Sequence, residues 1–174
     1  MTKRVLILAT DGFEQSELIE TKRLLEAAGL ETVVASPKSG EIRGWNHTDW
    51  GESVKVDAAL DDVSSDDFDA LMLPGGQMNP DILRIQSKAI ELIEDFDDAG
   101  KPIAAICHAP WLLVEADIVD GRTMTGWPSI RTDLENAGAD VVDEEVVVDG
   151  NIITSRKPED IPAFSQALID ALAD

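Results

Sequence analysis

The chain has 174 residues, 35 of them acidic and 14 basic, for a formal net charge of −21 at pH 7. This length suits one domain with a sizeable buried core, and we expect a single domain over residues 1–174. A negative field of this size repels nucleic acids and anionic membranes, so we expect neither as a partner. One cysteine excludes an internal disulfide.

The first predicted element is a core strand over residues 3–9. The N-terminus has a basic start and a short apolar run, as a signal peptide has. The run ends at Asp11 with no small-residue cleavage site, so we interpret it as a strand. No apolar stretch approaches the roughly 20 residues that a membrane helix needs. We therefore expect a cytoplasmic protein.

Strand-like and helix-like segments then alternate along the chain. Further strands are expected over residues 31–36, 53–56, 70–73 and 103–106, followed by a hairpin of 146–149 and 152–155. Helices are expected over residues 16–28, 80–99, from Cys107 to about 116, 128–137 and 158–173. Residues 40–50 are expected to form a loop. This alternation predicts an α/β fold with a parallel sheet covered by helices on both faces.

Three segments with reactive or flexible residues follow predicted strands. They are residues 11–14, residues 74–76, and the pair Cys107 and His108. Ligands of parallel sheets bind outside the carboxyl ends of the strands. We therefore expect these segments to meet at one site.

The only cysteine, Cys107, lies at the corner between a buried strand and a helix. A thiol at such a corner faces the positive end of the helix dipole and several free N–H groups. Both favour the thiolate, which is the nucleophilic form. Serine hydrolases of the α/β type place their nucleophile on a similar corner. We interpret Cys107 as a nucleophile, and the alternative is a small apolar side chain that fills the core.

Backbone N–H groups near this corner offer an oxyanion site. Gly75 and Gly76 follow a strand, and paired glycines let the backbone approach a substrate closely. One glycine N–H and the N–H of His108 are then positioned to hold the oxyanion that forms when Cys107 attacks a carbonyl. An ordinary tight turn is the alternative for the glycines.

Glu14 ends the segment that follows the first strand, at the same predicted edge as Cys107. A partly buried, protonated Glu14 would donate a hydrogen bond to the thiolate and tune its pKa. A simple helix cap is the alternative. We expect Glu17 and Glu20, further along the helix, to be solvated.

The chain has two histidines, His47 and His108, so a Cys–His pair within one chain must use one of them. A glutamine amidotransferase needs a histidine well after its cysteine, and none follows His108, so this activity is not expected. His47 lies in a loop with two tryptophans, where it either contributes to the site or is merely exposed.

Several motifs resemble those of the PfpI-type proteins, of the superfamily of the Parkinson-associated deglycase. They are AICHAPW, LPGG, DGFEQSE, TGWPSIRTD, EEVVVDGNIITSR and PEDIPAF, and they span nearly the whole chain. The resemblance implies a flavodoxin-like three-layer sandwich with a mostly parallel sheet, similar to class I glutamine amidotransferases. It also implies that Cys107 is the nucleophile, His108 its base and Glu14 the carboxyl that contacts the thiol. Gly76 and His108 would supply the oxyanion N–H groups.

The resemblance further implies a site completed by a second subunit. In peptidase-type members an acid from the neighbouring subunit orients the histidine, and the matching residue here is Asp81. We therefore expect a homo-oligomer, either a dimer or a trimer of dimers. Trp127 resembles an aromatic residue at the pocket entrance, and a core or interface tryptophan is the alternative.

Members of this family are called intracellular peptidases, glyoxalase III enzymes and protein deglycases. We expect a cysteine hydrolase without cofactor or metal, acting on methylglyoxal, glyoxal or early glycation adducts on proteins, with a role in stress protection. Peptidase action on peptides is one alternative. A redox-sensing stress chaperone that oxidises Cys107 is another.

The acidic residues are spread over the whole chain and are not gathered in a tail. A lysine-poor, acidic surface suits a high-salt cytoplasm, where salt screens the self-repulsion. We infer a halophilic source and predict that stability falls at low salt. An acidic protein from an ordinary cytoplasm is the alternative.

Overall fold

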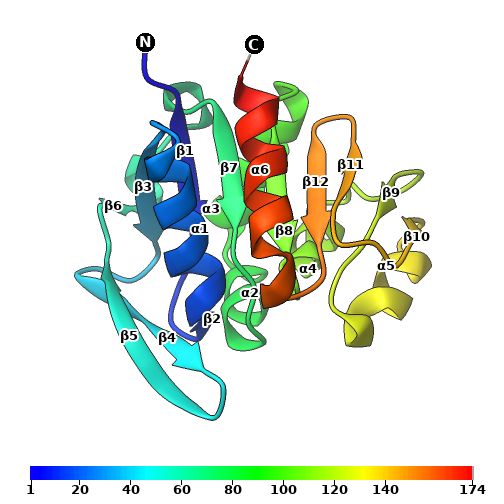
Figure 1. Ribbon diagram of the computed structural model, residues 1–174, viewed down its shortest axis with the longest axis horizontal. Helices are drawn as coiled ribbons and strands as arrows, with labels where there is room; N and C mark the ends of the chain where they lie inside the picture. The colour runs from blue at the N-terminus through cyan, green and yellow to red at the C-terminus, as the bar shows by residue number, and fades with distance from the viewer. Residues whose placement is uncertain (174) are drawn as a thin grey trace.

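The computed structural model describes residues 1–173, which form a three-layer α/β sandwich (Figure 1). The central sheet has seven strands in the order β11-β12-β8-β7-β1-β3-β6. These strands are β1 (Arg4–Leu8), β3 (Glu31–Ser36), β6 (Ala58–Ala59), β7 (Ala70–Leu73), β8 (Ile103–Ile106), β11 (Val147–Asp149) and β12 (Ile152–Ser155). All pair in parallel except β11 with β12, which forms the predicted hairpin. The predicted fold class is confirmed.

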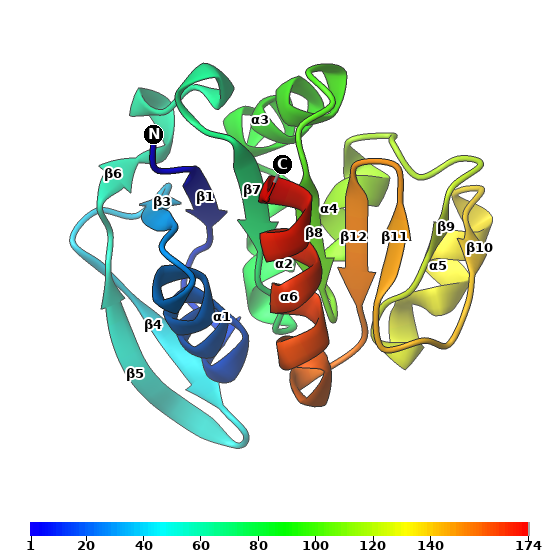
Figure 2. The same cartoon turned by 45° about the horizontal axis from the view of Figure 1, so that its top comes forward.

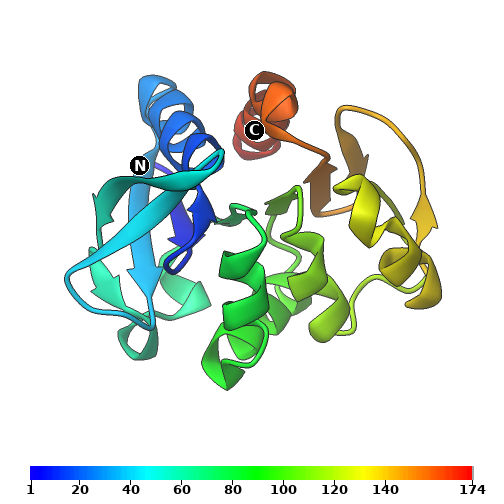
Figure 3. The same cartoon turned by 90° about the horizontal axis from the view of Figure 1, so that it is seen from below.

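Helices cover both faces of the central sheet (Figure 3). They are α1 (Gln15–Ala27), α2 (Met78–Leu83), α3 (Ser87–Asp98), α4 (Pro110–Glu115), α5 (Arg131–Asn136) and α6 (Ile161–Leu172). Leu6 and Leu8 of β1 share one core cluster with α3 and α4, whereas Val5 and Ile7 share the other with α1 and α6. A strand covered on both faces needs apolar residues at every position, which explains the continuous apolar runs in the sequence.

The prediction of a loop over residues 40–50 is wrong. β4 (Glu41–Asn46) and β5 (Asp49–Lys55) pair as an antiparallel hairpin, and β2 (Phe13–Glu14) adds to β4 in parallel. The hairpin extends beyond the main sheet beside α1 (Figure 2). Ile42 and Gly44 are buried while Arg43 is exposed, so β4 keeps the alternation of a half-buried strand.

The predicted helix over residues 80–99 is two helices, α2 and α3. Gln86 has extended backbone angles, with φ −92° and ψ 104°, and precedes the first turn of α3. Leu83 and Ala89 are buried while Ile85 is 79% exposed. A single apolar stripe therefore cannot continue through this segment, and the chain turns between the two helices.

Two other predicted helices begin with a 3₁₀ turn. Residues Pro128–Ile130 precede α5, and Pro158–Asp160 precede α6. β9 (Thr123–Met124) and β10 (Asp140–Val141) form a small parallel pair beyond β11. Among residues 1–173, no helix has both the length and the apolar character that crossing a membrane requires.

The carboxyl ends of β1 and β7 are joined by a buried amide. Asn79 accepts a hydrogen bond from the Thr10 nitrogen at 2.8 Å and donates to the carbonyls of Pro74, at 2.9 Å, and Gly75, at 3.2 Å. Its side chain is fully buried, so these bonds are shielded from water. Asn79 thereby fixes the two loops on which the site is built.

Candidate active site

Cys107 directly follows β8 in a left-handed backbone conformation, with φ +66°. Such a conformation costs a non-glycine residue about 1–2 kcal/mol. It is held by two hydrogen bonds, from the Cys107 nitrogen to the Ser155 carbonyl at 3.0 Å and from the Trp127 nitrogen to the Cys107 carbonyl at 2.8 Å. The predicted corner is therefore a strained elbow, a form of backbone common at functional sites.

The elbow brings the Cys107 sulfur among several polar groups. The backbone N–H groups of Gly76 and His108 donate hydrogen bonds to it. The Nδ1 atom of His108 lies 3.2 Å from Sγ. The buried Glu17 carboxyl lies close enough to the same thiol to act on it electrostatically. Nucleophile, histidine, carboxyl and the N–H pair thus meet around one atom.

Two predictions about glutamates are wrong. Glu17 is fully buried instead of solvated, and the carboxyl with the larger effect on the thiol is Glu17 instead of Glu14. Glu17 shares the buried face of α1 with Thr21 and Leu25, at successive spacings of four residues. Glu14 precedes the first turn of α1, lines the cleft and accepts a hydrogen bond from Ser16 at 3.2 Å.

Burial dominates the titration of this pair of groups. It raises the pKa of Glu17 well above its ordinary value, and the nearby Glu14 charge adds to the rise. Burial also raises the pKa of the Cys107 thiol, and the Glu17 charge adds to it, whereas the N–H groups of Gly76 and His108 oppose it. The N–H groups at the corner favour the thiolate, as predicted from sequence, but burial outweighs them.

A protonated Glu17 changes this balance. Without its charge, Glu17 no longer raises the pKa of the Cys107 thiol, and its O–H can donate to the sulfur. Because the carboxyl's own pKa is raised, it keeps its proton to higher pH than an exposed glutamate. The two groups titrate as a coupled pair. When the proton that they share lies on Glu17, a protonated carboxyl stands beside a thiolate.

His108 is nearly buried, with 8% of its surface exposed, and burial lowers its pKa, which favours the neutral imidazole. Trp127 stacks on it with ring centroids 5.9 Å apart and planes 22° apart. Trp111 packs edge-on at 5.1 Å. Within residues 1–173, the side-chain hydrogen-bond partner of the imidazole is Cys107. The two tryptophans set its orientation.

These groups open into a cleft of about 980 Å³. His47, from the turn between β4 and β5, and Trp127 both line it, as does Gly76. A Cβ added at Gly76 would lie 2.6 Å from backbone atoms, so the close approach requires glycine. Gly75 does not line the cleft, and its N–H instead donates to Glu17 Oε1 at 2.9 Å.

Sequence reasoning missed one wall of the cleft, formed by Lys157, Pro158 and Glu159. These residues follow β12, whose carboxyl end lies beside that of β8 in the sheet. The hairpin that contains β12 was predicted from the sequence. Residues that follow β12 could therefore have been expected at the same edge of the sheet as Cys107. No group of three or more His, Cys, Asp or Glu side chains in the described part of the chain could hold a metal ion.

Within one subunit, Asp81 does not line this cleft. It is exposed on the first turn of α2. The neighbouring Ile82 and Ile85 are also exposed, at 39% and 79%. One chain therefore does not bring Asp81 to His108. The role expected for Asp81 in a partner subunit stays a prediction.

An elbow cysteine at the edge of a parallel sheet, beside a histidine and a buried glutamate, defines a flavodoxin-like protein with a cysteine site. The chain matches the DJ-1/PfpI family over residues 3–171 and belongs to this family.

Relatives in this family align over almost their full length. General stress protein 18 of Bacillus subtilis is 46% identical over 168 residues, covering 95% of each chain. Protein/nucleic acid deglycase 2 of Escherichia coli is 41% identical over 175 residues, covering 99% of each. The crystal structure of Drosophila melanogaster DJ-1beta superposes with a TM-score of 0.90 at 33% identity, covering 99% of this chain and 91% of that one. The resemblance inferred from the motifs is confirmed.

Proposed function

We propose that the protein is a cysteine hydrolase that converts small dicarbonyls such as methylglyoxal to hydroxy acids and reverses early glycation adducts on proteins. The observation that carries this proposal is the convergence of Glu17, His108 and two backbone N–H groups on the Cys107 sulfur. The deglycase named among the relatives supports the same reaction class.

The first step is addition of Cys107 to an aldehyde. The sulfur forms a bond to the aldehyde carbon, and the proton shared by Cys107 and Glu17 moves to the carbonyl oxygen, giving a hemithioacetal. The N–H groups of Gly76 and His108 already point at the sulfur, so they lie beside the new oxygen and stabilise its charge. The step needs no net change of charge in a buried site, which keeps its desolvation cost low.

Neutral His108 acts next as a base. It removes the hydrogen from the former aldehyde carbon and returns a proton to the adjacent carbonyl carbon, while the hydroxyl proton passes from the former aldehyde oxygen to the adjacent oxygen. The adduct thereby becomes a thioester of a 2-hydroxy acid. Water then attacks the thioester and releases the hydroxy acid and the thiol. The sum is one dicarbonyl plus one water to one hydroxy acid. For an early adduct on a protein, the amine or guanidine leaves with a proton.

Peptide cleavage is the weaker alternative. An amide leaving group must be protonated by a firmly oriented histidinium, and the described residues of one chain place no carboxylate on the His108 ring. Addition of the thiol to an aldehyde does not require an oriented histidinium. Asp81 of a second subunit would supply that carboxylate, and the exposed Ile82 and Ile85 beside it suit a subunit contact. A homo-oligomer therefore forms part of the proposal.

The test is D-lactate formation from methylglyoxal without added thiol, in multimolar KCl. Wild type is compared with Cys107→Ser, His108→Ala and Glu17→Gln, each checked for folding by circular dichroism. Activity in wild type, and its loss in Cys107→Ser and His108→Ala, is the expected result. Lactate formation by Cys107→Ser, or no activity in folded wild type, contradicts the proposal.

Two parallel assays separate the alternatives. Hydrolysis of unmodified peptides without lactate formation would favour the peptidase. The second assay treats the protein with a low concentration of peroxide and measures its mass. Conversion of the Cys107 thiol to a sulfinic acid, in a protein that shows no turnover, would favour the redox sensor.

A further inference from the structure

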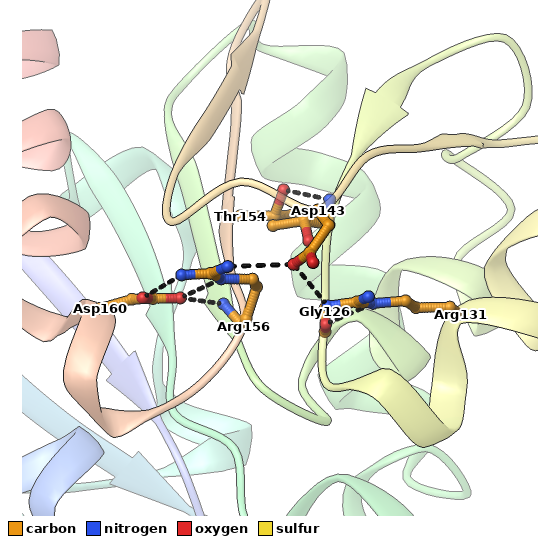
Figure 4. Close-up of polar contacts among 7 residues, drawn as sticks. Gly126, Arg131, Asp143, Thr154, Arg156 and Asp160 are labelled. Atoms are coloured by element: carbon orange, nitrogen blue, oxygen red, sulfur yellow. Dashed lines mark hydrogen bonds and ion pairs between the residues drawn. The ribbon is translucent and has the colours of Figure 1, made fainter.

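One carboxylate bridges the start of α5 and the loop after β12, next to segments that line the cleft. Asp143, on the segment between β10 and β11, lies between the guanidinium groups of Arg131 and Arg156 (Figure 4). Its Oδ1 accepts hydrogen bonds from Arg131 Nη2 and from Arg156 Nη1, each at 3.0 Å. The carboxylate is 65% exposed, whereas the two arginine side chains are 25% and 20% exposed.

The Arg156 end of this bridge is firmly anchored. The Arg156 guanidinium donates to both oxygens of Asp160 at 2.9 Å, and its backbone nitrogen donates to the same carboxylate at 2.9 Å. The Asp160 side chain is 3% exposed, so this bidentate pair is shielded from water. Arg156 directly precedes the cleft wall formed by residues 157–159. That wall holds its place without Asp143.

The Arg131 end is weakly anchored. Apart from Asp143, the partner of the Arg131 guanidinium is the Gly126 carbonyl, at a long 3.4 Å. Gly126 directly precedes Trp127, the residue that stacks on His108. The segment from Gly126 to Arg131 therefore carries one wall of the cleft. The Trp127 nitrogen, bonded to the Cys107 carbonyl, and the buried Ile130 also hold this segment, and Asp143 adds a brace that joins its Arg131 end to Arg156.

We propose that Asp143 is a positioning residue, which holds the Trp127 wall, and through it the His108 ring, by joining Arg131 to the anchored Arg156. Without the carboxylate, two guanidinium groups would face each other with no charge between them. Arg156 would stay on Asp160, so repulsion would displace Arg131 and the Trp127 segment. The effect on turnover rests on the proposed function, whereas the effect on Trp127 does not.

The test uses protein labelled with 5-fluorotryptophan, in which ¹⁹F NMR resolves each tryptophan and Trp127→Phe assigns its resonance. Asp143→Asn is compared with Glu144→Gln, which removes one exposed charge from the same segment. Glu144 forms no ion pair among residues 1–173. We expect the Trp127 resonance to shift or broaden in Asp143→Asn and to stay unchanged in Glu144→Gln. Asp143→Glu, which keeps the charge, should restore it in part.

Two further readouts separate positioning from general stability. The rate at which iodoacetamide alkylates Cys107 should change in Asp143→Asn, because His108 borders the sulfur, and this needs no substrate. With methylglyoxal, kcat should fall about tenfold and KM change less, short of the roughly hundredfold loss that a misplacement of about 1 Å causes. The Trp127 resonance and the rate of Cys107 alkylation can be measured even in a protein that has no dicarbonyl activity.

A double mutant tests the route through Arg131. In the background Arg131→Gln the brace is already absent, so Asp143→Asn should have little further effect on the Trp127 resonance or on alkylation. The proposal is overturned if Asp143→Asn leaves both signals at their wild-type values. It is also overturned if Glu144→Gln alters them equally, or if the two substitutions act additively.

Discussion

Replacing Gly76 by alanine tests how closely the backbone must approach the nucleophile. An added Cβ would lie 2.6 Å from both the Glu14 nitrogen and the Gly12 oxygen, and Gly76 has φ +85°. The left-handed conformation costs alanine about 1–2 kcal/mol. Overlap with backbone that cannot rotate away adds about 1–3 kcal/mol. The sum of about 2–5 kcal/mol should lower the Tm by roughly 4–20 °C in a chain of this size.

Two other glycines separate these contributions. Gly29, at the end of α1, has φ +89° but nothing within 4 Å of an added Cβ, so Gly29→Ala should lose about 1–2 kcal/mol from conformation alone. Gly75 is outside the left-handed region, but its added Cβ would lie 2.6 Å from the Ile106 carbonyl and 2.8 Å from the Cys107 Cβ. Gly75→Ala should therefore lose stability through overlap alone.

The assays are thermal and urea unfolding together with the rate of Cys107 alkylation. Gly29→Ala should alkylate at the wild-type rate because Gly29 follows the C-terminal end of α1 and does not line the cleft, whereas Gly75→Ala and Gly76→Ala should change the rate. The reasoning is refuted if Gly76→Ala loses no more stability than Gly29→Ala. It is refuted equally if Gly75→Ala matches wild type in both assays.

Three further predictions follow from the buried polar groups and the charge. Because burial raises the pKa of Glu17, its contribution to stability is full below its ordinary value of 4.5 and is lost as the pH rises through the raised value. The stability of Glu17→Gln relative to wild type should therefore rise with pH, by about 1.4 kcal/mol per unit of pKa shift. Glu20→Gln is the matched control on the same helix, because a hydrogen bond from Arg23 lowers the pKa of Glu20. In urea unfolding, the stability of Glu20→Gln relative to wild type should not rise with pH. Thr154→Val should cost about 1–3 kcal/mol by leaving the buried Thr125 N–H unpaired, whereas Thr154→Ser, which keeps the hydroxyl, should cost less. The net charge of −21 predicts that the Tm rises as the Debye length shortens from about 30 Å at 0.01 M KCl to about 8 Å at 0.15 M. A flat Tm across that range would contradict the reasoning about surface charge.

The layers and the nucleophile corner could be predicted from sequence because both depend on short-range patterns. β1 and β8 are apolar at every buried position, as strands covered on both faces must be. The change from that run to a helical pattern placed Cys107 on the corner. The topological rule for parallel sheets then brought residues 74–76 to the same edge.

Glu17 could not be assigned in this way. Its position on α1 is equally consistent with a solvated glutamate, because the helix alternates charged and apolar residues. Only the loop after β7 gives it a partner, through the Gly75 N–H, and only the elbow places the thiol beside it. Both contacts join segments more than 50 residues apart in the chain. A pattern within one helix carries no information about them.

The β4–β5 hairpin escaped prediction for a different reason. Its turn contains His47 with φ +58° instead of the Asn-Gly or Gly-Gly pair that usually marks such turns. The register also shifts between Arg43 and Trp45, so β4 and β5 pair irregularly at that point. The turn nonetheless delivers His47 to the cleft.

Burial has the largest effect on the pKa of this cysteine. α4 has only six residues, and the net effect of the surroundings is to raise the pKa of the Cys107 thiol. A nucleophile of this kind becomes reactive when a neighbour holds its proton, and Glu17, whose own pKa is raised, is the buried group able to do so. In the proposed reaction the same proton is then available for the aldehyde oxygen. The Cys107–Glu17 pair therefore supplies both the nucleophile and the proton. An exposed carboxylate at this position would give up its proton to water and leave the thiol without an acid.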